Sequence, residues 1–177
     1  MFPIIIRYGV IGGLVVALPM IGLMVFAGPN TFFAGGMLYG YTSMILALIA
    51  VFMGIKHYRD KALGGAIKFG TALLLGLSIS AVASTLYAIG WEISLAATGL
   101  DFPTAYYKPM LDAAVARQAS PEELQALEAQ ADSFATMYRN PVYRIPMTFV
   151  EMFPVGILVS LVSAGLLRNS RLLPARA

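Results

Sequence analysis

The sequence of 177 residues has no cysteine and a single histidine, and both scarcities limit its chemistry. Without cysteine it can form neither a disulfide bond nor a thiolate metal site, and it has no cysteine nucleophile. His57 cannot build a histidine metal cluster by itself. No serine stands beside a histidine or lysine that could act as its base. We therefore expect no catalytic residue, no metal and no cofactor.

Charge is scarce as well. Only 12% of the residues are charged, against about a quarter in a soluble globular chain, and 59% are hydrophobic. This composition predicts one membrane domain over residues 1–177 rather than two soluble domains. No nucleic-acid-binding motif is present, so we expect no nucleic-acid partner. The expected partners are membrane lipids, together with another copy of the chain or another membrane protein.

Four apolar stretches are long enough to cross a hydrocarbon layer about 30 Å thick at about 1.5 Å per residue. The expected membrane helices cover residues 8–27, 37–55, 69–91 and 147–167. Only Arg7 carries charge before the first of them, which fits a cleaved signal peptide poorly, so we expect a retained helix. The predicted fold is an all-α polytopic membrane protein with four transmembrane helices.

The short connections between these helices differ in composition. Residues 28–36 are uncharged and rich in turn-forming residues. Residues 56–68 are strongly basic, and Gly64 and Gly65 interrupt them. We expect both segments to be loops.

Residues 98–145 form the one sizeable extramembrane segment. The run from Ser120 to Glu123 combines a capping serine, a proline at the first helical position and a glutamate three residues after the cap. Apolar residues then recur at intervals of three and four until Asn140, and a weaker helix is expected over residues 106–118. These features predict an amphipathic helical hairpin whose apolar side rests on the membrane domain or in the headgroup layer.

Basic residues are distributed unevenly between the two sides of this arrangement. One side carries a single carboxylate, Asp60, and the basic residues Arg7, Lys56, Arg59, Lys61, Lys68, Arg168, Arg171 and Arg176. The other side carries four basic residues against eight carboxylates. Because lysine and arginine favour the cytoplasmic side, both termini are expected in the cytoplasm and the hairpin outside it.

Small residues recur every four positions along the third and fourth membrane helices, which places them on one side of each helix. They include Gly76, Ser80 and Ser84 in the third helix, and Gly156 and Ser160 in the fourth. This spacing is typical of close helix packing, and a substrate groove is the alternative.

Glu151 is the most informative single residue. Counting back from Arg168 places it about 5 Å inside the hydrocarbon boundary, where a carboxylate needs a partner or a proton. It is therefore either a proton-accepting or cation-binding group, or a structural carboxylate that holds Arg144, Tyr143 or a side chain of the hairpin.

Glu92 should lie at a similar depth, in the interface beside Trp91, which with Tyr87 forms an expected aromatic anchor. Two close carboxylates could share a proton or bind a cation. The alternative is that Glu92 and Glu151 have independent structural roles.

The basic segment offers a second candidate site. Lys56, Arg59, Lys61 and Lys68 could hold an anionic lipid headgroup or a polyprenyl phosphate. Alternatively they only fix the topology, with Asp60 capping a turn.

Three runs look familiar: GIKHYRD from Gly54, GGAIKF from Gly64, and EMFPVGILVSLVSA from Glu151. With the Arg7-Tyr8-Gly9 start, they resemble a family of small bacterial four-helix membrane proteins catalogued only as a domain of unknown function. The resemblance covers nearly the whole chain. It implies four helices, an extracytoplasmic hairpin between the third and fourth, and the bacterial inner membrane, and it implies no activity.

Three functions are compatible with these features. The favoured one is a non-enzymatic accessory or assembly protein that presents the hairpin outside and the basic segment inside. The second is a small oligomeric transporter, or a lipid- or ion-binding membrane protein, that uses Glu92 and Glu151. A membrane enzyme ranks last, because no nucleophile is paired with a base.

Overall fold

The computed structural model describes residues 1–170 and residue 174, and for residues 29–39 it describes the backbone only. The helices in order are α1 Phe2–Gly22, α2 Pro29–Ala62, α3 Phe69–Thr98, α4 Phe102–Ala116, α5 Pro121–Tyr138 and α6 Pro141–Leu167. A π-helical turn, η1 (Leu23–Ala27), continues α1. The all-α fold and the position of the hairpin between the third and fourth long helices are confirmed.

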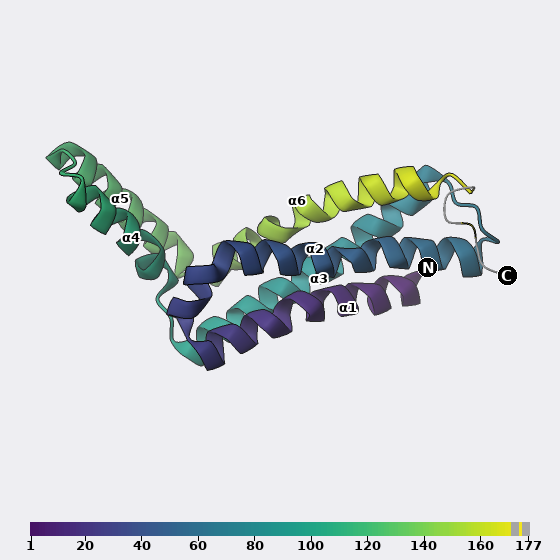
Figure 1. Cartoon of the computed structure of the whole chain (residues 1–177), viewed down its shortest axis with the longest axis horizontal. Helices are drawn as coiled ribbons and strands as arrows, with labels where there is room; N and C mark the ends of the chain where they lie inside the picture. Colours follow the sequence, from purple (N-terminus) through teal and green to yellow (C-terminus); the bar gives the residue numbers. More distant parts are fainter. Residues whose placement is uncertain (171–173, 175–177) are drawn as a thin grey trace.

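Helices α1, α2, α3 and α6 form an elongated bundle, and α4 and α5 leave one end of it as an arm (Figure 1). Helix α3 is central, because it packs against α1, α2 and α6. We call the end that carries the arm the hairpin end. The opposite end holds the N-terminus and the end of α6, and we call it the basic end after Arg7, Lys56, Arg59, Lys61, Lys68 and Arg168.

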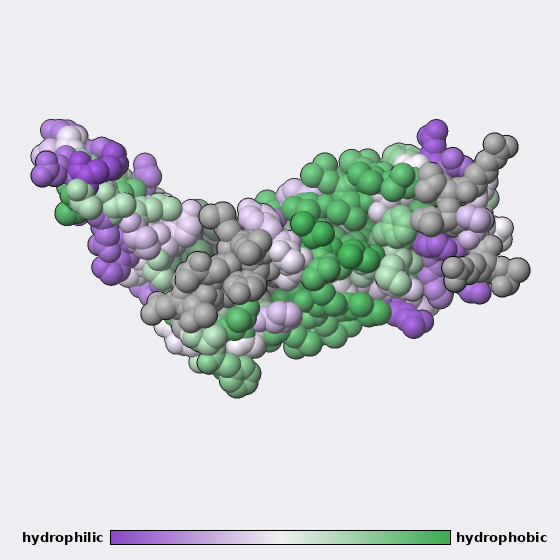
Figure 2. Space-filling view, viewed as in Figure 1, coloured by the Kyte–Doolittle hydropathy of each residue, from purple (hydrophilic) through white to green (hydrophobic). Residues whose placement is uncertain are grey.

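The hydrophobic and hydrophilic residues on the surface of the bundle are distributed as in a membrane protein. Hydrophobic side chains cover its middle, while hydrophilic residues gather on the arm and at the basic end (Figure 2). Four helical stretches are long and apolar enough to cross a membrane: Phe2–Ala27, Gly40–Ala62, Phe69–Thr98 and Pro141–Leu167. By helix length and hydropathy the chain is therefore a multi-pass membrane protein.

Helix α2 is much longer than the predicted 37–55. Toward the basic end it continues to Ala62, so the basic segment is largely helical. Nothing before Gly64 breaks the helix, and Lys56 donates to Asp60 one turn later, a pairing that supports a helix. The chain turns only where Gly64 and Gly65 adopt φ values of 66° and 96°.

The turn-rich connection predicted over 28–36 is also wrong. Its turn is confined to Gly28, which has a φ of 84° and is followed by Pro29 at the first position of α2. Proline is well suited to that position because its missing N–H group needs no partner there.

The other membrane helices also extend beyond their predicted apolar stretches. Helix α1 begins at Phe2 rather than residue 8. Helix α3 ends at Thr98 rather than residue 91, where the amide of Gly99, at a φ of 64°, donates to the carbonyl of Leu95 at 2.9 Å. Helix α6 begins at Pro141 rather than residue 147, with Asn140 as its cap.

The small residues of α3 and α6 lie in the contact between these two helices. A Cβ atom on Gly156 would lie 2.7 Å from the Cβ of Ser80, and one on Gly76 would lie 2.9 Å from the Cβ of Ser160. The Ser160 hydroxyl donates to the Gly156 carbonyl at 2.7 Å, and the Ser80 hydroxyl donates to the same oxygen at 3.3 Å. These residues therefore let the two backbones approach closely. Ser84 is buried one turn further along α3.

The arm has an apolar core of its own. Ser120 caps α5 as predicted, accepting a hydrogen bond from the Glu123 amide at 3.2 Å. Helix α4 begins at Phe102, earlier than the predicted 106. The aromatic rings of the two helices pack on one another: Phe102, Tyr106, Tyr107, Phe134 and Tyr138. The apolar side of the hairpin thus faces inward between α4 and α5 and meets the bundle only at its base, which corrects the expectation that it rests on the membrane domain.

Candidate functional site at the base of the arm

Polar and aromatic side chains converge where the arm joins the bundle. Helix α3 extends beyond the predicted end, and α6 begins almost directly after α5, so three helices meet at this point. Their contributions are Tyr87, Trp91 and Glu92 from α3, Tyr138 from α5, and Arg144 and Glu151 from α6. We call this group the arm base.

Glu92 and Arg144 form a two-pronged ion pair. The Arg144 Nε atom donates to Glu92 Oε1 at 2.6 Å, and Nη2 donates to Oε2. The remaining Nη1 donates to the Tyr138 carbonyl at 3.2 Å, so one guanidinium joins all three helices. Both side chains are largely but not fully buried, with 27% of Glu92 and 17% of Arg144 exposed. Arg144 was one of three partners considered for a structural Glu151, together with Tyr143 and a side chain of the hairpin, and the structure pairs it with Glu92 instead.

Trp91 and Tyr138 lock α3 to the arm. The indole Nε1 of Trp91 donates to the Tyr138 hydroxyl at 2.5 Å, and the Phe102 ring stacks on Tyr138 with centroids 5.0 Å apart. Only 6% of Trp91 and 8% of Tyr87 is exposed. The prediction that these two residues form a surface aromatic anchor is therefore wrong, because both point into the protein.

Raising the pH should loosen the arm base. Burial raises the pKa of the Tyr138 phenol from 10 to about 12. Folding thus favours the protonated phenol. Its contribution to the free energy of unfolding is complete below pH 10 and is lost as the pH rises toward 12. Trp91 is the one tryptophan in the sequence and bonds to Tyr138, so its fluorescence reports the ionisation of that phenol directly. We expect its fluorescence to be constant from pH 7 to 10 and to change above that.

The matched control for this titration is Tyr138→Phe. That variant should lose the alkaline change, and its Trp91 emission should already differ from the wild type at pH 7 because the indole N–H has lost its acceptor. An identical alkaline change in Tyr138→Phe would contradict the assignment.

Glu151 has a different environment from Glu92. It accepts a hydrogen bond from the Tyr87 hydroxyl at 3.1 Å, and its side chain is otherwise exposed at the surface of the bundle. Among residues 1–170 no lysine or arginine forms an ion pair with it. At about 1.5 Å per residue it lies ~26 Å along α6 from Arg168, within the thickness of a hydrocarbon layer. The two glutamates therefore take separate partners, a neutral phenol and a guanidinium.

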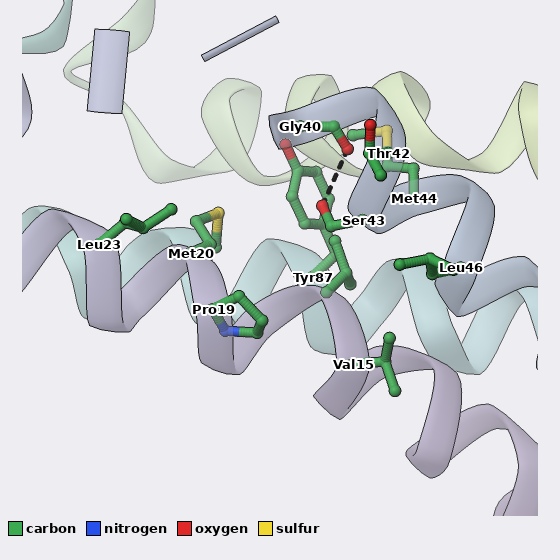
Figure 3. A pocket seen from close by; sticks show the side chains of 11 residues that line it. Val15, Pro19, Met20, Leu23, Gly40, Thr42, Ser43, Met44, Leu46 and Tyr87 are labelled. Carbon is green, nitrogen blue, oxygen red and sulfur yellow. Dashed lines mark hydrogen bonds between the residues drawn. The ribbon is translucent and has the colours of Figure 1, made fainter. Parts of the chain in front are cut away.

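Tyr87 also borders a cavity. This space of about 540 Å³ lies between α1 and α2 (Figure 3). Its walls are Val15, Val16, Pro19, Met20 and Leu23 on one side and Gly40, Thr42, Ser43, Met44 and Leu46 on the other. Tyr87 is the one lining residue from α3 and joins the cavity to Glu151.

The four basic candidates for lipid contact do not form one surface. Arg59 is fully buried, and its guanidinium donates to Asp60 Oδ1 at 2.6 Å and to the Leu167 carbonyl at 3.4 Å. Lys56 binds Asp60 and is half-buried, while Lys61 and Lys68 are exposed. Arg59 thus joins α2 to the end of α6, and a contact with lipid stays a prediction for the three lysines.

Sequence reasoning named Tyr87 and Arg144 but gave them other roles, and it assigned no role to the Tyr138 hydroxyl. One signal was present: Glu92 and Arg144 are opposite charges near the arm-side ends of two neighbouring membrane helices. In the described part of the chain, no three histidine, aspartate or glutamate residues are close enough to hold a metal ion.

Comparison with known protein families places this chain in one of unknown function. A family model described as "Protein of unknown function (DUF4199)" matches residues 7–169, which includes the arm and nearly all of the four long helices. This confirms the resemblance to a family of unknown function. Neither a curated protein nor a solved structure matches the chain.

Proposed function

Because the chain belongs to the DUF4199 family, whose function is unknown, we propose that it is a non-enzymatic accessory or assembly protein that holds its arm toward a partner. The observation that carries this proposal is the arm itself, a pair of packed helices that projects from the bundle (Figure 1). A docking element binds more tightly when it is ordered before the partner arrives, because less conformational entropy is then lost on binding.

The arm has the internal order that such a role needs. Its aromatic rings pack between α4 and α5, and the arm base ties it to α3 and α6 through Trp91 and Arg144. Its surface carries five carboxylates against two basic residues from Phe102 to Tyr138, with exposed apolar groups at Val115 and Met137. We infer a protein partner with a basic and partly apolar surface.

The proposed setting is the bacterial inner membrane, with the basic end in the cytoplasm and the arm outside. The described basic residues of the segment 56–68, which are Lys56, Arg59, Lys61 and Lys68, lie at the end opposite the acidic arm, which is the distribution that the positive-inside rule favours. Arg171 and Arg176, which contribute to the same count, lie outside the described residues.

The alternative of a small oligomeric transporter or an ion-binding protein that uses both glutamates has less support. Such a site requires the two carboxylates to share a proton or a cation. Glu92 is instead bonded through both oxygens to Arg144, and Glu151 accepts from Tyr87.

The experiment is photo-cross-linking in the native membrane. A photoreactive phenylalanine analogue replaces Val115 or Met137 on the arm, or Leu158 or Val162 on the exposed face of α6. We expect discrete protein adducts of one mass from the arm positions and none of that mass from the α6 positions. Absence of an adduct from both arm positions, in membranes where the variants reach wild-type levels, would exclude the proposal.

A further inference from the structure

We propose that the cavity between α1 and α2 binds the hydrocarbon chain of a single-chain membrane amphiphile whose head group, an alcohol or a protonated amine, donates a hydrogen bond to Tyr87. The site does not depend on the role of the arm. Its volume of about 540 Å³ lies within the range of roughly 300–1,000 Å³ that is usual for small-molecule sites.

The cavity walls have the chemistry of a chain-binding site. Among the side chains that the structure describes, those lining the cavity on α1, η1 and α2 are apolar apart from Thr42 and Ser43. An apolar cavity of this kind does not hold water well, because a bound water molecule needs two to four polar partners. The Ser43 hydroxyl is already committed as a donor to the Gly40 carbonyl at 2.9 Å.

Its position favours an occupant taken from the lipid phase. Tyr87 follows Lys68 by 19 residues, which places it ~28 Å along α3 from the basic end and in the half of the bundle nearer the arm. Val15 and Leu46, on opposite walls, are 39% and 54% exposed and belong to the apolar belt of the bundle. Counted over a hydrocarbon layer about 30 Å thick, Tyr87 therefore lies near its arm-side boundary, and the exposed parts of the walls face the hydrocarbon.

The backbone of α1 departs from a regular α-helix beside this space. Pro19 lies inside α1, where it removes one backbone hydrogen bond, and η1 follows from Leu23. Local π-helical turns are frequent at functional sites. Both features line the cavity, so the irregular part of α1 and the cavity coincide.

Tyr87 determines the polar group that fits. Figure 3 shows its ring between the two walls, with the hydroxyl directed to the side of α2 where Gly40 and Ser43 lie. The hydroxyl donates to Glu151, which leaves its oxygen able to accept a hydrogen bond from a ligand. An ionised carboxylate or phosphate head group has no proton to donate to that oxygen, whereas a donor group extends a chain of hydrogen bonds from ligand to Tyr87 to Glu151.

The test uses hexadecanol with a photoactivatable diazirine near the end of its chain, added to the full-length protein in phosphatidylcholine nanodiscs. We expect labelled peptides from the cavity walls of α1 and α2, and loss of that label when unlabelled hexadecanol is added in excess. Equal labelling of the exposed face of α6, with no competition, would overturn the proposal.

Three substitutions sharpen the result. Leu46→Trp should fill the cavity and abolish the specific label, whereas Ile89→Trp, at a similarly exposed position on α3 outside the cavity, should not. Val15→Trp fills the cavity from the opposite wall and replaces Leu46→Trp if that variant does not fold. Labelling that persists in the folded cavity-filling variant would contradict the site.

Tyr87→Phe tests the head group separately, against hexadecyl methyl ether as a competitor that cannot donate. Wild-type protein should prefer the alcohol to the ether by about 3- to 10-fold, the value of one hydrogen bond, and Tyr87→Phe should bind both equally. Equal competition by alcohol and ether in the wild type would overturn the assignment of Tyr87.

Discussion

Gly156→Leu is expected to separate α6 from α3 and to destabilise the bundle more than any other single change considered. A Cβ atom at position 156 would already lie 2.7 Å from the Cβ of Ser80, and leucine adds three further carbon atoms at the same place. Helix α6 can accommodate them only by moving away from α3. Overpacking of this kind costs about 1–3 kcal/mol or more.

The cost should fall at the high end of that range because hydrogen bonds are lost with the contact. The Ser80 hydroxyl bonds the Gly156 carbonyl on the neighbouring helix, and it would be left buried without that partner. In a membrane, no water is present to replace the lost bond. We therefore expect a loss of about 3 kcal/mol and a large fall in the thermal midpoint, measured by heating the detergent-solubilised protein.

Gly165→Leu is the matched control. It makes the same change in the same helix, but nothing lies within 4 Å of a Cβ atom at position 165. That variant should unfold at or above the wild-type temperature, because glycine in a helix is unfavourable. Equal midpoints for Gly156→Leu and Gly165→Leu would contradict the packing of α3 on α6.

Arg144→Met is expected to release the arm from a fixed orientation while the bundle stays folded. It removes both hydrogen bonds to the Glu92 carboxylate and the bond to the Tyr138 carbonyl. The Glu92 charge would remain in a largely buried position without a partner. The loss in stability should lie between the losses expected for breaking an exposed ion pair and a buried ion pair, about 2 kcal/mol.

Distances between spin labels measure this effect directly. Because the chain has no cysteine, labels attach only to introduced cysteines, here Ala116→Cys at the end of α4 and Leu74→Cys on the exposed side of α3. We expect a narrow distance distribution in the otherwise wild-type protein and a broad one with Arg144→Met.

The control for this measurement is Arg117→Met near the tip of the arm. The Arg117–Glu123 pair is exposed, with 59% and 48% of the two side chains accessible, so its loss should leave the distribution narrow. A distribution that stays equally narrow with Arg144→Met would show that Arg144 does not fix the arm.

The helices could be predicted from the sequence because their signals are local. Long apolar runs identify membrane helices, and the Ser120 cap with the spacing that follows it identifies α5. The positions of the helix ends were predicted less accurately than the helices themselves, because hydropathy locates the membrane-spanning part and not the end of the hydrogen-bonded helix. Helix α2 therefore runs past Ile55, where apolarity stops, until glycine at Gly64 permits the turn.

The partners within the site could not be predicted for a different reason. Glu92 and Glu151 were recognisable as costly side chains, but their partners depend on how α3, α5 and α6 are rotated against one another. Tyr87 and Trp91 illustrate the same difficulty, because aromatic residues near a membrane boundary can face lipid or protein and only the packing decides. Arg59 was predicted to contact lipid because it is basic. It is buried instead because the end of α6 lies against it.

The most direct test of an arm held on the outer side of the inner membrane is cysteine labelling with a membrane-impermeant maleimide. Ala116→Cys marks the arm and Lys68→Cys marks the basic end, and both positions are exposed. In cells whose outer membrane is permeabilised and whose inner membrane is intact, we predict labelling at position 116, with position 68 labelled only after the inner membrane is also permeabilised. Labelling of position 68 and protection of position 116 would place the arm in the cytoplasm and contradict the proposed function.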